Sequence, residues 1–202
     1  MKKIVFALGL AALTMVACKK DDPAATTPAK GSGSFTYDGN TYALTQGTLD
    51  AYGGDSGVYN IDINLASSGL TLHEVNGKID SVSGVGHVLF LALYTSNATT
   101  LQTGSYNYDG ISEFPSVNTF TDGTIGINAN FQTEDGTFDF VSSGTVTITS
   151  ATRTSVAFTF TGMTESQKTL TANFSGSLPF YDYSASGVAP FRGPISMVPK
   201  EF

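Results

Sequence analysis

Nearly every residue of the heptapeptide Val88-Leu-Phe-Leu-Ala-Leu-Tyr94 is apolar. A short apolar run of this kind is typical of a strand covered on both faces, or of an inner strand beside a ligand cavity. In an extended chain Leu89, Leu91 and Leu93 share one face, since side chains alternate. We therefore predict that this strand lies at the centre of the core and that Leu91 is buried.

The segments on either side of this strand show weaker but regular strand patterns. Tyr59, Ile61, Ile63 and Leu65 alternate with polar residues, which predicts a half-buried strand whose Asn60, Asp62 and Asn64 face solvent. Asp38-Gly39 lies between two short β-prone runs and predicts a tight hairpin over Phe35–Leu44. Further strands are expected at 103–108, 124–131, 137–149, 155–161 and 169–178.

About nine strands joined mostly by short turns predict an all-β fold with a single antiparallel meander. A closed or flattened β-barrel is the favoured form, because sequential hairpins close simply and closure removes sheet edges. A two-sheet β-sandwich is the alternative. The connections 67–86 and 109–123 are long for hairpins and are expected to be loops of functional interest.

Composition supports this fold class. Only 13% of the 202 residues are charged, while Gly (22), Ser (21) and Thr (27) exceed a third of the chain. Lys, Glu, Gln and Arg number 8, 5, 4 and 2, and this shortage of strong helix formers argues against a helical bundle or an α/β fold. The surface is therefore expected to present hydroxyl and amide groups.

The N-terminus has the pattern of a bacterial lipoprotein signal. Residues 1–17 combine a basic start with an apolar run too short to span a bilayer, which is typical of a cleaved leader. Met15-Val-Ala-Cys18 is similar to a lipobox. That resemblance implies that Cys18 carries a diacylglyceryl thioether and that membrane lipid is a partner of the mature chain. An ordinary secretory signal followed by a free thiol is the alternative.

The next segment indicates where the protein is placed. Residues 18–33 lack apolar periodicity and predict a lipidated cysteine followed by a flexible tether. Lys20, Asp21 and Asp22 resemble the export signal of Bacteroidota-type lipoproteins, which implies the outer membrane and a domain facing the cell exterior; an ordinary charged linker is the alternative. The β-domain is expected at 34–183, and the Pro-containing residues 184–202 are expected to form a surface strap.

The strand and turn segments of the domain indicate the same class of protein. The opening segment 35–44 and the segments 144–149, 158–160 and 174–183 resemble those of β-rich Bacteroidota-type surface lipoproteins. The resemblance rests on strands and turns. It therefore implies a fold and a location, and it carries no active-site residues.

Catalytic and metal-binding motifs are missing from the sequence. There is no Gly-x-Ser-x-Gly, no phosphate loop, and His73-Glu74 lacks the second His of a zincin helix. His73 and His87 are the only histidines, and we expect neither to act in catalysis. His73, Glu74, Asp80 and His87 could form a metal site, and Asp50 and Asp55 could bracket a calcium-binding turn. For both sets, an ordinary polar loop or turn is the favoured interpretation. No catalytic residue, metal or cofactor is predicted.

Binding is the more natural function for such a chain. The aromatic residues Tyr106, Tyr108, Phe180, Tyr181 and Tyr183 are candidates for a surface that contacts a glycan or a partner protein of an outer-membrane complex; core-edge residues with wetted hydroxyl groups are the alternative.

Two further expectations concern modification and partners. Asp80-Ser81-Val82 matches a short O-glycosylation pattern, with Ser81 as the acceptor. Without Lys2 and Lys3, 8 basic and 17 acidic residues remain, a net charge of −9, so nucleic acid is not an expected partner. The alternative functions are a structural subunit or adhesin that assembles through edge strands and, less favoured, a hydrolase.

Overall fold

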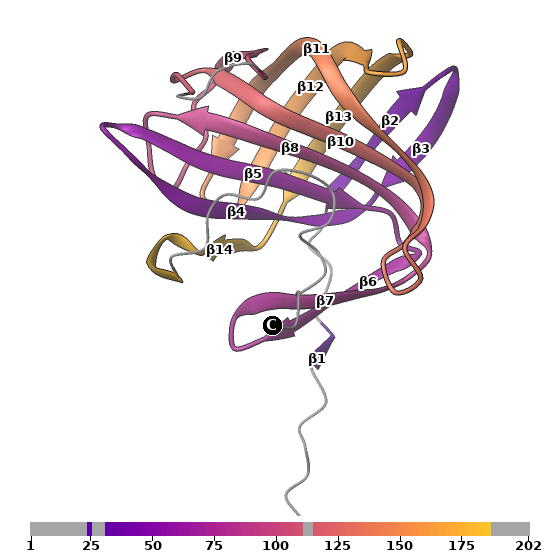
Figure 1. Cartoon of the computed structure of the whole chain (residues 1–202). Helices are drawn as coiled ribbons and strands as arrows, with labels where there is room; N and C mark the ends of the chain where they lie inside the picture. The colour runs from indigo at the N-terminus through magenta and orange to yellow at the C-terminus, as the bar shows by residue number, and fades with distance from the viewer. Residues whose placement is uncertain (1–23, 26–30, 111–114, 187–202) are drawn as a thin grey trace, which may run out of the picture.

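The computed structural model describes residues 24–25, 31–110 and 115–186, and Figure 1 shows the whole chain. The described part consists of strands and one 3-10 turn, η1 (Ser184–Ser186), so the predicted all-β class is confirmed. The predicted lipid-attachment residue Cys18, the export residues Lys20, Asp21 and Asp22, and segment 187–202 of the predicted strap lie outside the described residues.

Eleven strands form the larger sheet, which curls into a half-barrel (Figure 1). In chain order they are β2 (Gly31–Tyr37), β3 (Asn40–Leu44), β4 (Gln46–Asp55), β5 (Val58–Ala66), β8 (Gly86–Thr95), β9 (Gly104–Tyr108), β10 (Thr119–Asn130), β11 (Asp135–Thr152), β12 (Ser155–Thr164), β13 (Thr169–Ser177) and β14 (Phe180–Asp182). Across the sheet the order is β14-β4-β5-β8-β10-β9-β11-β12-β13-β2-β3. A smaller sheet contains β1 (Ala24–Ala25), β6 (Leu70–Val75) and β7 (Lys78–Gly84), in the order β1-β6-β7.

The predicted single meander of about nine strands is wrong in strand number and in order. Two pairs are parallel, β9 with β10 and β14 with β4, so the sheet is mixed. β9 enters between β10 and β11 because those two strands diverge. Residues 135–140 of β11 pair with β10, and residues 145–148 pair with β9. A strand as long as β11 can serve two partners in this way, which a pattern of alternating residues does not reveal.

The prediction for the central strand is confirmed. β8 lies between β5 and β10, and Leu89, Leu91 and Leu93 are each 0% exposed in the main core. Its other face is covered too, since Val88 and Phe90 are buried. The apolar run therefore reflects coverage from both sides of the sheet.

The smaller sheet provides part of this outer cover. Residues 67–86 were expected to be a loop, but most of them form the β6–β7 hairpin, whose Leu72 and Val82 pack in a second core cluster with Val88 and Phe131. The hairpin turn is Asn76-Gly77, and both residues have positive φ (53° and 73°). Asn-Gly between alternating strands is a known hairpin signal, so the sequence did contain the evidence against a loop.

The predicted tether is also shorter than expected. β1 pairs with β6 inside the segment 18–33, and β2 begins at Gly31 rather than after residue 33. A Cβ atom at Gly33 would lie 2.2 Å from the backbone oxygen of Asn173. Glycine is therefore required here by the close approach of β13, not by flexibility.

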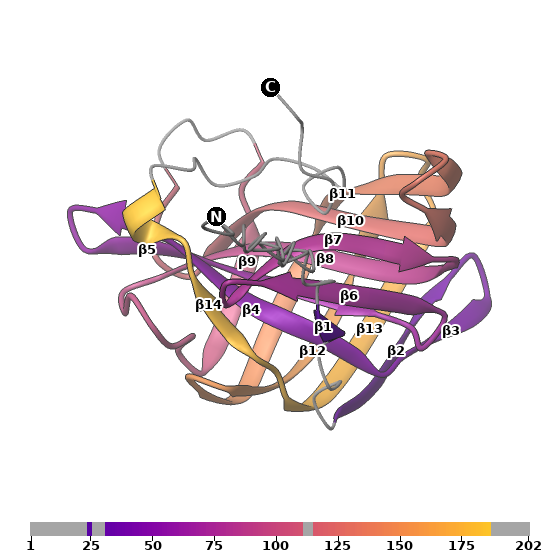
Figure 2. The same ribbon diagram turned by 90° about the horizontal axis from the view of Figure 1, so that it is seen from below.

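The solvent-facing assignment for Asn60, Asp62 and Asn64 is wrong. Their exposed fractions are 2%, 0% and 6%. These residues alternate with Ile61 and Ile63 of the main core, so they lie on the opposite, outer face of β5. The β6–β7 hairpin lies on that outer side of the sheet (Figures 1 and 2). Alternation of polar and apolar residues therefore marks the two faces of this strand without telling which face reaches solvent.

Candidate functional site

The five aromatic residues that are candidates for a ligand-contact surface lie in two separate places, on β9 and at β14. Tyr106 is 0% exposed and belongs to the main core, so its predicted role at the surface is wrong. Its hydroxyl group donates to the carbonyl oxygen of Gln102 (3.1 Å) and accepts from the Gln102 N–H (2.9 Å). A buried tyrosine whose polar atom is satisfied in this way is a structural residue.

Tyr108 and Phe180 are half-buried, and each has a partner within the chain. The Tyr108 ring packs at a tilt against Phe120, with 5.2 Å between the ring centroids. The Arg153 guanidinium lies over the Phe180 ring, 4.7 Å from its centroid. These rings therefore fit the core-edge alternative better than a ligand-stacking surface.

Tyr181 and Tyr183 are brought together, at β14 and just beyond it. The Tyr181 hydroxyl donates to Glu74 Oε2 on β6 (2.7 Å). Tyr183 stacks on Tyr52 of β4, with ring centroids 5.2 Å apart and planes 13° apart, and Lys78 Nζ lies 4.9 Å from the Tyr183 centroid. These contacts fasten the β6–β7 hairpin to the larger sheet. They join Glu74 of β6 and Lys78 of β7 to the tyrosines at β14, and Tyr183 in turn to β4.

The two histidines lie apart on different strands. His73 Nε2 is 2.7 Å from Ser83 Oγ within the small sheet. His87 on β8 packs against Tyr42 (4.7 Å between centroids), its Nδ1 accepts from the Asn128 N–H at 3.3 Å, and burial lowers its pKa. Among the residues that the structure describes, no three His, Cys, Asp or Glu side chains converge in a way that could hold a metal ion.

Ser81 lies on a strand rather than in the loop expected for it. It is a half-buried residue of β7 and stands opposite His73 in the register. Asp80 beside it is exposed and Val82 is buried. Its glycosylation stays a prediction, now with a strand as the acceptor site.

Asp50 and Asp55 do not share a turn, as the calcium alternative required. Asp55 ends β4 at the exposed turn, where its Oδ1 accepts from the Ser56 N–H (2.7 Å). Asp50 lies in the middle of β4 with an exposed fraction of 7%. Its neighbour across the strands is Asp62 of β5, directly opposite in the register.

Asp50 and Asp62 form a buried acidic pair that sequence reasoning missed. Asn64 Nδ2 donates to Asp50 Oδ2 (2.8 Å), and Asn60 Nδ2 donates to Asp62 Oδ1 (2.9 Å). The second carboxylate oxygen of each, Asp50 Oδ1 and Asp62 Oδ2, is buried without a hydrogen-bond partner. Each carboxyl group is thus held by one amide donor and is left with one unsatisfied acceptor.

Burial controls the charge of this pair. Desolvation raises the pKa of Asp50 to about 7, and it raises the pKa of Asp62 well above its usual value, with a further upward contribution from the Asp50 charge. Burial likewise raises the pKa of Tyr52, Tyr181 and Tyr183, and the Asp50 charge adds to each. A protonated carboxyl group has an O–H that can donate a hydrogen bond, which a carboxylate lacks. Burial disfavours the charged form, so the pair favours the protonated form at mildly acid pH.

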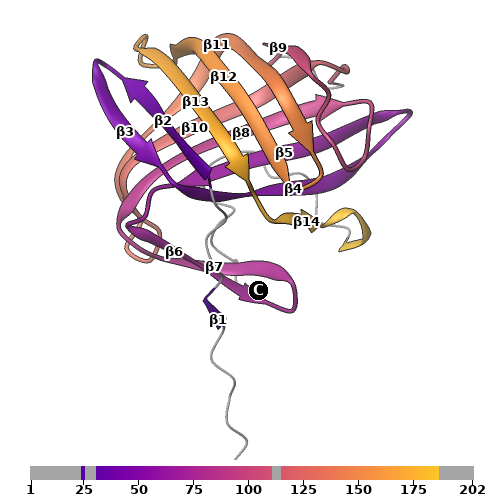
Figure 3. The same ribbon diagram turned by 180° about the vertical axis from the view of Figure 1, so that it is seen from behind.

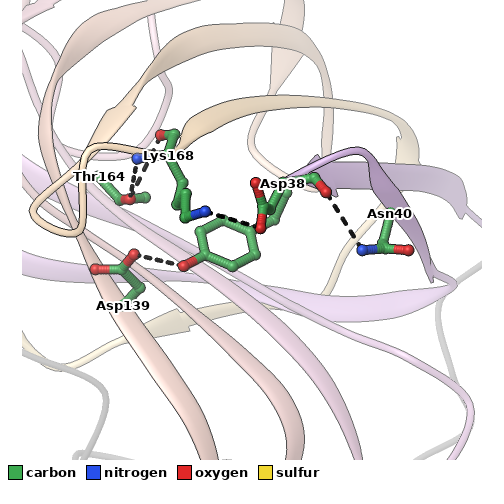
Figure 4. A network of polar contacts seen from close by, with 6 residues as sticks. Asp38, Asn40, Asp139, Thr164 and Lys168 are labelled. Atoms are coloured by element: carbon green, nitrogen blue, oxygen red, sulfur yellow. Dashed lines mark hydrogen bonds and ion pairs between the residues drawn. The ribbon is translucent and has the colours of Figure 1, made fainter.

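A third buried carboxylate, Asp139 on β11, shows the opposite behaviour (Figure 4). It is 4% exposed and accepts from the Tyr37 hydroxyl (2.8 Å) and from the N–H groups of Phe140 (2.9 Å) and Ser166 (3.4 Å). Burial opposes ionisation, but the hydrogen bonds outweigh it and lower the pKa of Asp139. Asp139 is therefore a charged structural anchor that ties β2 and the β12–β13 turn to β11.

The outer face of β2, β3, β11, β12 and β13, five neighbouring strands of the larger sheet (Figure 3), is named here the hydroxyl face. In register across these five strands lie the threonines Thr145, Thr161, Thr171, Thr36 and Thr41. A second row contains Thr147, Thr159, Asn173, Ser34 and Ala43.

The part of the hydroxyl face that holds these two rows carries no charge of its own. Residues 31–37, 40–44, 141–152, 155–164 and 169–177 include no Asp, Glu, Lys or Arg. Thr159, Thr161 and Thr171 are exposed, as is Asn173. Rows of this kind repeat hydrogen-bonding groups about every 4.8 Å across the strands. Sequence reasoning found the hydroxyl-rich composition but could not find the rows, because strand register decides them.

The comparisons with known proteins identify no relative. No family model matches the chain, and no curated protein or solved structure matches it either. The functional argument therefore rests on the geometry described above.

Proposed function

We propose that this chain is a lipid-anchored, cell-surface binding module that recognises a neutral glycan on its hydroxyl face. The observation that carries the proposal is the in-register array of Thr, Ser and Asn side chains without a charged residue among them. The exposed members are Thr41, Thr159, Thr161, Thr171 and Asn173. Hydroxyl and amide groups both donate and accept hydrogen bonds, which matches the groups that an uncharged sugar presents. A charged ligand would find no partner there.

The proposed binding surface is the hydroxyl face and not the aromatic residues predicted from the sequence. The aromatic residues singled out in the sequence have intramolecular partners, whereas Thr159, Thr161 and Thr171 of β12 and β13 are exposed. A long polar surface on the outside of a sheet suits an extended polymer better than a small molecule, which needs a concave pocket. We further propose that the chain is not an enzyme and that nucleic acid is not its partner, given its net negative charge.

Binding to insoluble neutral polysaccharides tests the glycan proposal. Replacing Thr159, Thr161 and Thr171 together with Ala removes three exposed hydroxyl groups, each expected to contribute about 0.5–1.5 kcal/mol if it is hydrogen-bonded to the ligand. We expect the affinity measured in a depletion assay to fall by about tenfold or more.

The matched control carries Thr71→Ala, Thr103→Ala and Thr137→Ala, three exposed threonines outside these rows. It should bind as the parent chain does. Lack of binding to every neutral polysaccharide, or equal loss in both triple variants, would refute the proposal. Capture of a single protein from the cell surface instead of a glycan would support the partner-protein alternative.

The anchor has its own test. Cys18 is the only cysteine, so a thioether to lipid can form nowhere else. We expect Cys18→Ala to abolish incorporation of labelled fatty acid and to release the protein from the membrane fraction, since acyl chains provide the hold on the bilayer. Labelling that persists in this variant would exclude the lipobox assignment.

Placement on the outer face of the outer membrane is part of the same proposal. It is supported by Lys20, Asp21 and Asp22, which follow the lipobox directly. Nowhere in the described ranges does a helix have the length and apolar character that crossing a bilayer requires.

A further inference from the structure

We propose that the outer edge of β3 pairs with the β3 edge of a second copy of this chain, so that two half-barrels share one continuous antiparallel sheet. β3 is the terminal strand of the eleven-stranded sheet, and no described strand pairs with its outer edge. This interaction goes beyond the proposed glycan binding and does not depend on it, because it uses the backbone edge rather than the hydroxyl face.

The hairpin geometry shows which backbone groups face outward. The two turn residues, Asp38 (φ 49°) and Gly39 (φ 80°), both have positive φ, as a two-residue type I′ turn requires. In such a hairpin the residues flanking the turn, Tyr37 and Asn40, form a hydrogen-bonded pair, and hydrogen-bonded pairs then alternate along the ladder. Asn40, Tyr42 and Leu44 therefore bond to β2, and the N–H and C=O groups of Thr41 and Ala43 point outward.

The residue after β3 agrees with this assignment. By the same alternation the N–H of Thr45 also points away from β2, and it donates to the carbonyl oxygen of Ala66 (2.9 Å). That bond closes the corner where the chain passes from β3 into β4. The outward groups of Thr41 and Ala43 are thus the ones left for a partner strand.

β3 also lacks the devices that normally protect an edge. Natural edge strands are blunted by charge, proline, a bulge or shortness. The opposite edge strand, β14, has only three residues, ends in Asp182 and is followed directly by η1. β3 consists of Asn-Thr-Tyr-Ala-Leu, without charge or proline, and its register with β2 runs unbroken.

The edge is rigidly held and electrically neutral. Leu44 and Phe35 are each 0% exposed, and the Tyr42 ring stacks on Phe35 (5.0 Å). The carboxylate at the hairpin tip, Asp38, is paired with Lys168 Nζ at 3.0 Å (Figure 4). Two copies can therefore bring their β3 edges together without like charges meeting, although the chain as a whole carries a net charge of −7.

One register satisfies all the outward groups at once. A two-fold antiparallel pairing centred on Tyr42 places Thr41 of each copy opposite Ala43 of the other, and both are outward-facing residues. Each copy supplies two N–H groups, so the two copies make four hydrogen bonds. The identical edge on every copy makes a second copy the natural occupant.

Cysteine cross-linking in the cells' own membranes tests this register. One copy carries Thr41→Cys and the other Ala43→Cys; opposed Cα atoms in a hydrogen-bonded pair are about 5.5 Å apart, within disulfide range. We expect a mixed disulfide dimer under mild oxidation. The control pair, Thr41→Cys with Ser96→Cys in an exposed turn, should give at most about one fifth of that yield, because its cysteines are not opposed. Oxidation of the parent chain, whose only cysteine is Cys18, gives the background of disulfide formation.

A second measurement uses the full chain in mild detergent. Thr41→Lys with Ala43→Lys puts like charges directly opposite each other across the proposed interface, which disfavours pairing. We expect native mass spectrometry to show dimers for the parent and for the exposed-turn control Ser96→Lys with Ala98→Lys, and monomers for the edge variant.

Three results would overturn the proposal. They are a monomeric parent with no mixed disulfide, equal dimerisation of the edge and control variants, and a cross-link from Thr41→Cys to a different polypeptide. The glycan assay replaces Thr159, Thr161 and Thr171 in the parent chain, and none of these lies on β3, so the two proposals can fail separately.

Discussion

Asp50→Asn is expected to raise the free energy of unfolding at pH 8 by as much as about 4 kcal/mol, and to change it by less than about 1 kcal/mol at pH 4. Burial raises the pKa of Asp50 from 3.8 to about 7, so the folded chain binds a proton that the unfolded chain has already lost across this range. The stability of the parent therefore falls as the pH rises from about 4 to 7, by about 1.4 kcal/mol per pH unit.

Urea unfolding of both proteins at pH 4, 6 and 8 measures this effect. Asparagine has nearly the shape of aspartate and keeps an oxygen that can accept from Asn64, whose Nδ2 now donates to Asp50. The control Asp80→Asn changes an exposed carboxylate and should alter stability by less than about 0.5 kcal/mol at every pH. A constant difference between Asp50→Asn and the parent at all three pH values would show that Asp50 is ionised in the folded protein throughout.

Leu91→Ala is expected to destabilise the fold by about 2–5 kcal/mol. Leu91 is 0% exposed in the middle of β8, and it packs in the main core beside Leu89 and Leu93. Truncation removes the transfer free energy of the buried methyl groups and leaves a cavity, because strands held on both sides cannot collapse into the space. β8 has such partners in β5 and β10.

The matched control for this truncation is Val85→Ala. Val85 is 52% exposed in the link between β7 and β8, so its loss should cost less than about 0.5 kcal/mol. Thermal or urea unfolding of the two variants gives the comparison directly. Equal losses at the two positions would place Leu91 outside the core.

Some elements of this fold can be predicted from the sequence and others cannot. The hairpin at Asp38-Gly39 and the buried β8 follow from local patterns, since a turn dipeptide and an unbroken apolar run each have one dominant structural meaning. The β6–β7 hairpin could have been found from Asn76-Gly77. The parallel pairing of β14 with β4 could not, because it joins segments far apart in the chain. The place of β9 beside β10 depends on the divergence of β10 and β11, which local patterns do not show.

The candidate site divides in the same way. Composition predicts an uncharged, hydroxyl-rich surface, but only the register of five strands aligns Thr145, Thr161 and Thr171 into a row. Tyr106 shows the converse, because a tyrosine with both hydrogen bonds satisfied inside the core has the same sequence signature as one at the surface.

The all-β class, the turn at Asp38-Gly39 and the burial of β8 follow from the amino-acid sequence, because each depends on neighbours within a few residues. Tertiary structure alone decided that Asp50 and Asp62 are buried opposite each other and that β3 ends the sheet with its outer edge unpaired by any described strand. The physical reason is that alternation tells which side chains share a face. What covers that face, or pairs with that edge, depends on segments tens of residues away in the chain.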